Sequence, residues 1–136
     1  MVLHDILSRM KTPDNLEAEV RASLISGDLT VSEHDDILAF LRARLGSAVS
    51  RGWFPEDPEM VLVEESVIDT DGEILRPDRV VIKDGKVLII DYKFGERDRR
   101  YERQIRKYMS VWCRMGYADV TGILWYVNDD EVVTLC

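Results

Sequence analysis

The spacing of apolar residues along the chain changes near residue 60. Before that point they recur three or four positions apart, which predicts helices within residues 2–10, 16–26 and 30–52, separated by a break at 12–15. Ser32 is the expected N-cap of the third helix, because a serine there can accept a hydrogen bond from the first helical turn. The expected apolar stripe of that helix is Ile37, Leu38, Leu41 and Leu45.

After residue 60, apolar and polar positions alternate, which is typical of β-strands. The expected elements are strands over 60–68, 73–83 and 86–93, a helix over 96–116 that ends at Gly116, and strands over 120–127 and 132–136. The expected core stripe of the helix is Ile105, Tyr108, Trp112 and Met115. This order predicts an α/β fold: a mixed sheet that contains an antiparallel meander of three strands, with helices packed on its faces.

Length and composition favour one soluble globular domain. A chain of 136 residues with 46% hydrophobic and 32% charged side chains can bury a core, so we expect a single domain with N-terminal helices over 1–51 and a core over 58–136. No apolar run is long enough to cross a membrane, and no secretory signal is expected. Cys113 and Cys136 form neither a metal-binding spacing nor a disulfide framework, which favours a reducing, cytoplasmic setting.

Charge is distributed unevenly. The net charge of −8 argues against a general nucleic-acid coat protein. Residues 1–75 hold 6 basic and 16 acidic side chains, whereas residues 76–136 hold 12 basic and 10 acidic ones. An anionic ligand is therefore expected near the second half, although the basic segment 96–107, by its charge alone, is more simply explained as a solvated helix face.

The dipeptide Asp84-Gly85 predicts a two-residue, type I′ hairpin turn. Such a turn fixes the register, so that Lys83 pairs with Lys86, and further out Asp78 lies opposite Asp91. Since side chains alternate between the faces of a strand, both aspartates share the face of the apolar pairs Val80–Ile89 and Ile82–Val87, and Lys93 shares it too.

Two opposed carboxylates on a half-buried face repel each other and lose hydration. A divalent cation would make the pair favourable, and Mg²⁺ is commonly held by one or two carboxylates with water and phosphate oxygens. If Asp71-Gly72 is also a two-residue turn, Glu65 faces Asp78. Because Pro77 can shift this second register by one position, Glu64 is the alternative. Taken singly, each charge is better explained as a strand-end charge, with Lys93 neutralising an acid; three on one face favour a site.

The motifs "PD" (77–78) and "DYK" (91–93), followed by a helix with Gln104 and Tyr108, resemble the PD-(D/E)xK nuclease superfamily. The order of hairpin, D-Y-K and Q-x-x-x-Y is most similar to the RecB-like branch, found at the C-terminus of UvrD-like helicases of the AddAB and RecBCD type. The early "HDIL" (4–7) matches the H-x-x-L of that branch. The resemblance implies a restriction-endonuclease-like core with the order α-β-β-β-α-β and a chain cut from a larger helicase.

The resemblance also implies roles for individual residues. His4, Asp78, Asp91 and the backbone carbonyl of Tyr92 would hold Mg²⁺ or Mn²⁺. Lys93 would orient water or stabilise charge, with Gln104 and Tyr108 as further catalytic residues; the register count, not the resemblance, adds Glu65 to them. Gln104 is expected to hydrogen-bond either Lys93 or the substrate phosphate. The arginines expected to contact the DNA backbone are Arg97, Arg99, Arg100, Arg103 and Arg106.

The expected function is that of a metal-dependent DNA nuclease, most simply an exonuclease, in a bacterial helicase–nuclease that processes DNA ends during double-strand-break repair. Its partners would be single-stranded DNA, the helicase motor in the same chain and a second helicase–nuclease subunit, with no membrane. The alternative is a catalytically inactive nuclease fold that binds DNA or a partner subunit. A stand-alone restriction-type endonuclease is less well supported, because no separate specificity segment is visible.

Overall fold

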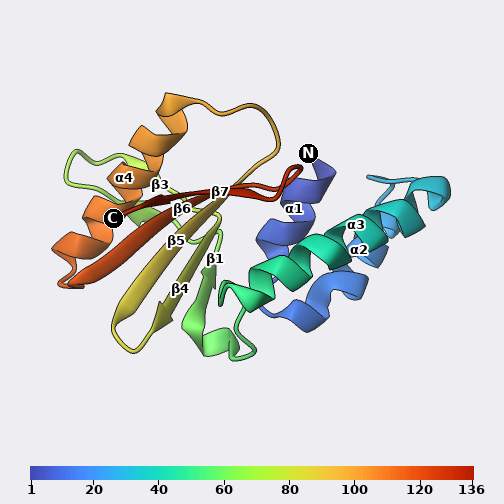
Figure 1. Ribbon diagram of the computed structural model, residues 1–136, viewed down its shortest axis with the longest axis horizontal. Helices are drawn as coiled ribbons and strands as arrows, with labels where there is room; N and C mark the ends of the chain where they lie inside the picture. Colours follow the sequence, from blue (N-terminus) through green and yellow to red (C-terminus); the bar gives the residue numbers. More distant parts are fainter. The chain divides into compact units, whose positions relative to one another are not determined.

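The computed structural model describes all residues from Met1 to Cys136. The chain divides into two compact units, Met1–Pro58 and Glu59–Cys136 (Figure 1). None of its helices combines the length and the apolar character that crossing a bilayer requires.

The N-terminal unit is helical. Its elements are α1 (Val2–Arg9), the short 3₁₀ helix η1 (Pro13–Asn15), α2 (Leu16–Ile25) and α3 (Val31–Ser50). Helix α2 contacts both α1 and α3, and Leu41 and Leu45 of the predicted stripe are buried. The prediction of Ser32 as N-cap is wrong: Thr30 caps α3, and the Glu33 carboxylate accepts a hydrogen bond from the Thr30 N–H at 2.9 Å, which completes a capping box.

The C-terminal unit is built on a mixed sheet, as predicted, and this sheet has five strands. After the 3₁₀ helix η2 (Pro58–Met60), its strands are β1 (Val61–Val63), β4 (Arg79–Lys83), β5 (Lys86–Lys93), β6 (Asp119–Tyr126) and β7 (Glu131–Leu135), in the order β1-β4-β5-β6-β7. All neighbours are antiparallel except β5 and β6, which are connected through α4 (Arg99–Arg114). A parallel pair requires such a crossover.

The predicted three-strand meander is interrupted by a separate hairpin. Strands β2 (Val67–Ile68) and β3 (Ile74–Leu75) form a two-stranded sheet of their own. The expected strand 60–68 breaks at Glu64, whose φ of 51° lies in the left-handed region. The expected strand 73–83 breaks before β4, where Pro77 has no N–H to donate to a ladder.

The register of the β4–β5 hairpin is confirmed. Lys83 pairs with Lys86, Ile82 with Val87 and Val80 with Ile89. Asp84 and Gly85 have φ values of 53° and 76°, the positive pair that a type I′ turn demands. Continuing this register by one residue beyond β4 brings Asp78 opposite Asp91.

The register predicted from Asp71-Gly72 is wrong by one residue. Val67 pairs with Leu75 and Asp69 donates its N–H to the Glu73 carbonyl, so the loop consists of three residues, 70–72. Gly72 takes the left-handed conformation (φ 80°) that three-residue hairpin loops require. The Asp69 carboxylate stabilises this loop by accepting hydrogen bonds from the N–H groups of Asp71 and Glu73.

Helix α4 covers the face of the sheet that carries Val80, Val87 and Ile89. Its buried residues are Ile105, Tyr108, Met109, Val111 and Trp112. Met115, predicted to belong to this stripe, is 57% exposed because the helix ends at Arg114 and Met115 is already the C-cap. The helix begins after Asp98, whose carboxylate accepts the Arg100 N–H at 2.9 Å.

Candidate active site

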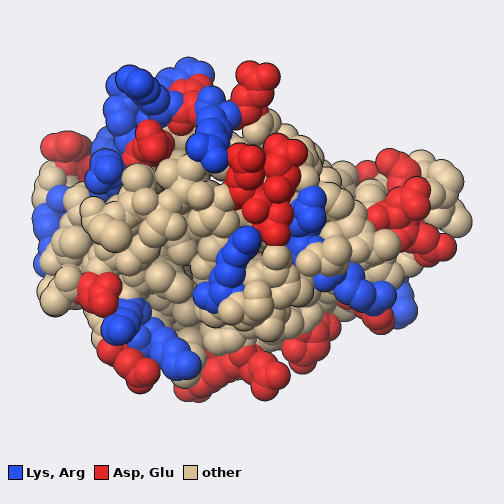
Figure 2. Space-filling view, viewed as in Figure 1, with Lys and Arg blue, Asp and Glu red and all other residues tan.

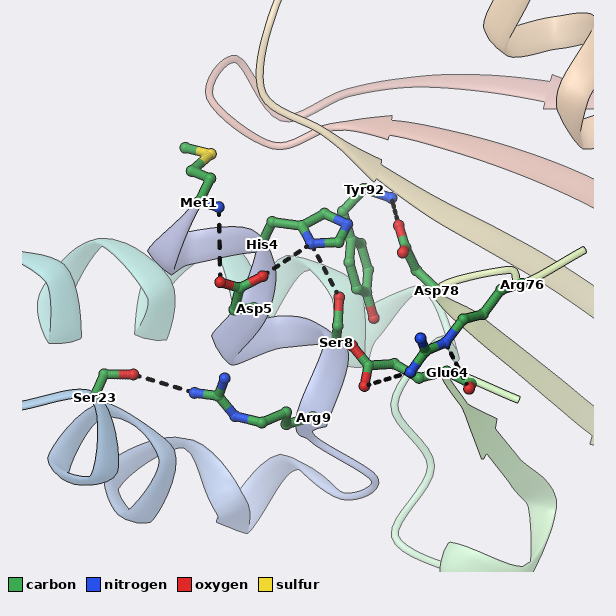
Figure 3. Close-up of polar contacts among 10 residues, drawn as sticks. All are labelled: Met1, His4, Asp5, Ser8, Arg9, Ser23, Glu64, Arg76, Asp78 and Tyr92. Atoms are coloured by element: carbon green, nitrogen blue, oxygen red, sulfur yellow. Dashed lines mark hydrogen bonds and ion pairs between the residues drawn. The ribbon is translucent and has the colours of Figure 1, made fainter. Parts of the chain in front are cut away.

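The structure brings Asp78 and Asp91 together at the open end of the β4–β5 hairpin. The Asp78 N–H donates to Asp91 Oδ1 at 3.0 Å. The Tyr92 N–H donates to Asp78 Oδ2 at 2.9 Å, as Figure 3 shows. Each acid is thus bonded to the backbone of the opposite strand. These two reciprocal bonds hold both carboxylates side by side where the regular ladder ends.

Asp91 is the buried member of the pair. Asp91 is only 3% exposed. Burial, together with the charge of Asp78, raises the pKa of its carboxyl group to about 6. The hydrogen bond from the Asp78 backbone and the nearby Lys93 act in the opposite direction. Ionisation of Asp91 is therefore less favourable than that of an exposed aspartate, and a further positive charge beside the pair would favour it, which is the electrostatic condition for a cation site.

Lys93 lies on the same face, as the hairpin register predicts. Its Nζ is 3.6 Å from Asp91 Oδ2 and donates a hydrogen bond to Gln104 Oε1 at 3.3 Å. The ammonium group also lies 4.3 Å from the centre of the Tyr101 ring, a cation–π contact. The expected bond between Gln104 and Lys93 is therefore present, and three partners fix the position of the lysine beside the acids.

Tyr108 is buried on the same side of the sheet. Burial and the charges of Asp91 and Asp78 raise the pKa of its hydroxyl. The phenol is therefore protonated and neutral at physiological pH. Gln104 precedes it by one helical turn, so α4 presents both side chains toward the end of the hairpin.

The prediction that Glu65 faces Asp78 is wrong. Glu64, the alternative predicted from the sequence, lies opposite Asp78. Val61, Leu62 and Val63 pair with Val81, Val80 and Arg79, and the Glu64 N–H donates to the Asp78 carbonyl at 3.3 Å. Glu65 is exposed. The carboxylate of Glu64 is paired with Arg76, whose Nη2 lies 3.3 Å away and whose Nε donates to the Glu64 carbonyl (Figure 3).

His4 lies on α1 of the N-terminal unit. Its Nδ1 is 3.4 Å from Ser8 Oγ and 3.6 Å from Asp5 Oδ1 (Figure 3). Both contacts lie within α1, and His4 and Ser8 are four residues apart, the spacing of neighbours on a helix surface. A role of His4 as a metal ligand remains a prediction.

The oxygen atoms at the hairpin end fit a small hard cation. The ring of Tyr92 points to the other face of the sheet, where it packs edge-on against Trp125 with centroids 5.9 Å apart. The Tyr92 N–H donates to Asp78, and the carbonyl of the next residue, Lys93, accepts from the Val127 N–H on the other side of β5. Because successive carbonyl groups of a strand point in opposite directions, the Tyr92 carbonyl points toward the side of Asp78. No group of three or more His, Cys, Asp or Glu side chains is arranged to hold a metal. Two carboxylates and one carbonyl, completed by water and phosphate, still match Mg²⁺.

The predicted DNA-binding arginines do not share one surface. Arg100 and Arg103 line a cleft of about 490 Å³ beside Gln104 and Tyr108. Arg97 and Arg99 line a smaller cleft near Tyr126, and Arg97 is paired there with Glu131 at 2.9 Å. Two cations of the larger cleft, Arg76 and Lys107, were not identified from the sequence. Lys107 could have been predicted from the sequence, because it follows Arg103 by one helical turn. Arg76 is indicated only by its position directly before the P-D motif.

No known family model matches the chain, and no curated protein is detectably similar to it. The resemblance to RecB-like nucleases therefore depends on the motif residues themselves.

Proposed function

We propose that this chain is a metal-dependent nuclease domain that hydrolyses DNA phosphodiester bonds. The observation that supports this most is the pair of carboxylates, Asp78 and Asp91, fixed side by side with Lys93 3.6 Å from Asp91. An acid pair with an adjacent lysine suits phosphoryl chemistry, in which cations stabilise the charge that develops on a phosphate.

Asp78, Asp91 and the Tyr92 carbonyl would hold Mg²⁺ or Mn²⁺; the role of His4 as a further ligand is implied by the resemblance alone. When bound, such an ion polarises the phosphate and lowers the pKa of a water molecule. Lys93, held by Gln104 and Tyr101, places a positive charge next to the ligands and stabilises the negative charge of the transition state. Gln104 orients the lysine, and the neutral hydroxyl of Tyr108 is available as a hydrogen-bond donor near the acids.

The same proposal extends to the context that the motifs suggest. The five-stranded sheet with the crossover helix α4 is compatible with a restriction-endonuclease-like core. The domain would belong to a UvrD-like helicase, act as an exonuclease on single strands that the motor delivers, and work with a second subunit in a bacterial cytoplasm during repair of double-strand breaks. These points follow from the resemblance alone.

One feature favours a second candidate, a catalytically inactive nuclease fold that binds DNA or a partner. Both carboxylates accept backbone N–H groups, and Lys93 compensates Asp91. The acids are thus already partly satisfied without a metal. In this candidate the pair would stabilise the hairpin end and perform no chemistry.

Cleavage assays on the full chain separate the two candidates. Labelled single-stranded and duplex DNA are incubated with Mn²⁺ or with EDTA, and Asp91→Asn and Lys93→Ala are compared with Asp129→Asn and Lys86→Ala, exposed residues of the same unit. We expect Mn²⁺-dependent cleavage that falls about 10²-fold or more in the two site variants only. Equal cleavage by Asp91→Asn, or none by the parent chain while it still binds DNA, would rule out the nuclease proposal.

A further inference from the structure

The larger cleft of the C-terminal unit lies between strand β3 and helix α4, and we call it the β3–α4 cleft. Its volume is about 490 Å³, the size of a site for a small organic ligand or a nucleotide. Four of its lining residues are cations and one is an acid. These are Arg76, Arg100, Arg103, Lys107 and Glu73. In a chain with a net charge of −8, this local excess of positive charge points to an anionic ligand.

The cations of the cleft are arranged along one line of α4 and its neighbouring hairpin. Arg100, Arg103 and Lys107 follow one another at intervals of three and four residues, so they share one face of the helix. Figure 2 shows basic side chains, interspersed with acidic ones, over the region where Figure 1 draws the first turns of α4. A row of cations with helical spacing suits a ligand that carries several phosphates in series.

Acidic side chains partly neutralise these cations. Lys107 forms an ion pair with Glu73, Arg76 with Glu64 and Arg100 with Asp98. All three pairs are solvent-accessible, and such pairs contribute little stability, roughly 0–1 kcal/mol each. A phosphate oxygen can therefore replace the carboxylate as partner at small cost.

One wall of the cleft is apolar and exposed. Ile74 lines the cleft and pairs across the two-stranded sheet with Ile68, and these side chains are 68% and 69% exposed. Two neighbouring isoleucines on a short hairpin offer contact to a flat apolar surface. The bases of a single strand can present such a surface, whereas stacked bases inside a duplex expose only their edges.

The cleft ends at the candidate active site. Gln104 and Tyr108 line it, Gln104 accepts the hydrogen bond of Lys93, and the charges of Asp78 and Asp91 act on Tyr108. A chain molecule lying in the cleft would therefore contact two residues of the candidate active site, Gln104 and Tyr108.

We propose that the β3–α4 cleft is the binding site for a single-stranded nucleic acid, with phosphates on Arg76, Arg103 and Lys107 and bases against Ile68 and Ile74. The Glu73 carboxylate competes with the phosphate that binds Lys107, so this phosphate must displace it. The direction of the strand toward Asp78 and Asp91 rests on the proposed nuclease function, but the binding itself does not. Such contacts position the strand without reading its sequence.

Binding is measured by fluorescence anisotropy with a labelled oligothymidylate and the full chain in EDTA, so that no cleavage is needed. Arg103→Ala and Lys107→Ala should bind several-fold more weakly, and Glu73→Gln several-fold more tightly, because it removes the competing carboxylate. The slope of log K against log salt should be about −2 for three contacted phosphates and about −1.4 for Arg103→Ala, which retains two. Arg114→Ala, an exposed arginine of the same helix outside the cleft, is the matched control.

Tighter binding by Glu73→Gln cannot result from misfolding, so it supports the cleft directly. Preference for duplex over single strand, weaker binding by Glu73→Gln, or equal losses for Arg114→Ala and Arg103→Ala would overturn this proposal. Loss of cleavage with this binding pattern intact would instead contradict only the nuclease function. A competition experiment tests whether the cleft recognises a strand or an isolated anion. At the same total phosphate concentration, an unlabelled oligothymidylate should displace the labelled strand far better than inorganic phosphate does. Equal displacement by the two competitors would count against the proposal.

Discussion

Asp91 has the least favourable environment among the acids of the candidate site. It is buried, it faces Asp78 on the neighbouring strand, and Lys93 is the compensating cation. Its pKa of about 6 lies above the ordinary value of 3.8. Ionisation of this one residue therefore couples the stability of the metal-free chain to pH.

The sign of this coupling follows from the number of bound protons. Between about pH 4 and pH 6 the folded chain retains a proton on Asp91 that the unfolded chain has released, so the free energy of unfolding falls as pH rises through this window. A shift of this size corresponds to a loss on the order of 2–3 kcal/mol. Urea denaturation in EDTA across this range should show the fall in the parent chain and a smaller one in Asp91→Asn.

Asparagine retains an oxygen that can accept the Asp78 N–H, so the substitution removes mainly the charge. At neutral pH we therefore expect Asp91→Asn to unfold at higher urea concentration than the parent chain. Asp129→Asn, on an exposed loop, should follow the parent curve. An Asp91→Asn variant that is less stable than the parent at neutral pH would show that Lys93 compensates the charge fully.

At the scale of elements, two hairpin loops decide which acids meet. The Asp84-Gly85 turn has a length that its residues specify, so the opposition of Asp78 and Asp91 was predictable from the sequence. The loop before β3 has three residues, and a D-G pair does not reveal whether a third residue joins the loop. With the third loop residue the register shifts by one position, and Glu64 instead of Glu65 lies opposite Asp78.

Long-range contacts explain what else the sequence left undetermined. Helix α4 and its apolar stripe follow from periodicity, but its end at Arg114, and thus the exposure of Met115, does not. Likewise, Arg76 and Lys107 line the same cleft, and Glu73 forms an ion pair with Lys107, only because the β2–β3 hairpin lies beside α4, some thirty residues further along the chain. The periodicity of apolar residues within one segment does not predict such a tertiary contact between two segments.

The position of α4 depends on the absence of a side chain at Gly122 of β6. A Cβ at this position would lie 2.7 Å from Met109 Sδ and 3.0 Å from Ile105 Cγ1. Gly122→Ala should therefore destabilise the chain by roughly 1–3 kcal/mol through overpacking, measured by urea denaturation. Since α4 also holds Gln104 against Lys93, cleavage should fall together with stability.

A double-mutant cycle tests the cause of this loss. Met109→Ala removes the atom nearest to the new methyl group, so Gly122→Ala should cost less in that background than in the parent chain. Strict additivity would mean that Met109 is not the obstacle. Ser110→Ala, one position further along α4 with its hydroxyl bonded to the Lys107 carbonyl, serves as the control background.

At the scale of the whole molecule, charge is separated along the chain. The first 75 residues contribute 16 acidic and 6 basic side chains, whereas the later part holds the cations of the β3–α4 cleft. Divalent cations will therefore gather loosely around many exposed acids, independently of any site. A response to metal carries information only if it depends on Asp78 and Asp91.

Thermal unfolding with and without Mn²⁺ provides this test. An ion that binds the folded chain stabilises it by RT ln(1 + [L]/Kd), which is about 2.7 kcal/mol when its concentration is 100 times Kd. We expect the Tm of the parent chain to rise by several degrees at pH 7 and that of Asp78→Asn and Asp91→Asn to change little, because each loses a ligand. Asp36→Asn, an exposed acid of the N-terminal unit, should retain the full shift. An equal rise in all four proteins would mean that the ion screens the general negative charge, and the acid pair would then be a structural feature of the hairpin with no metal to hold.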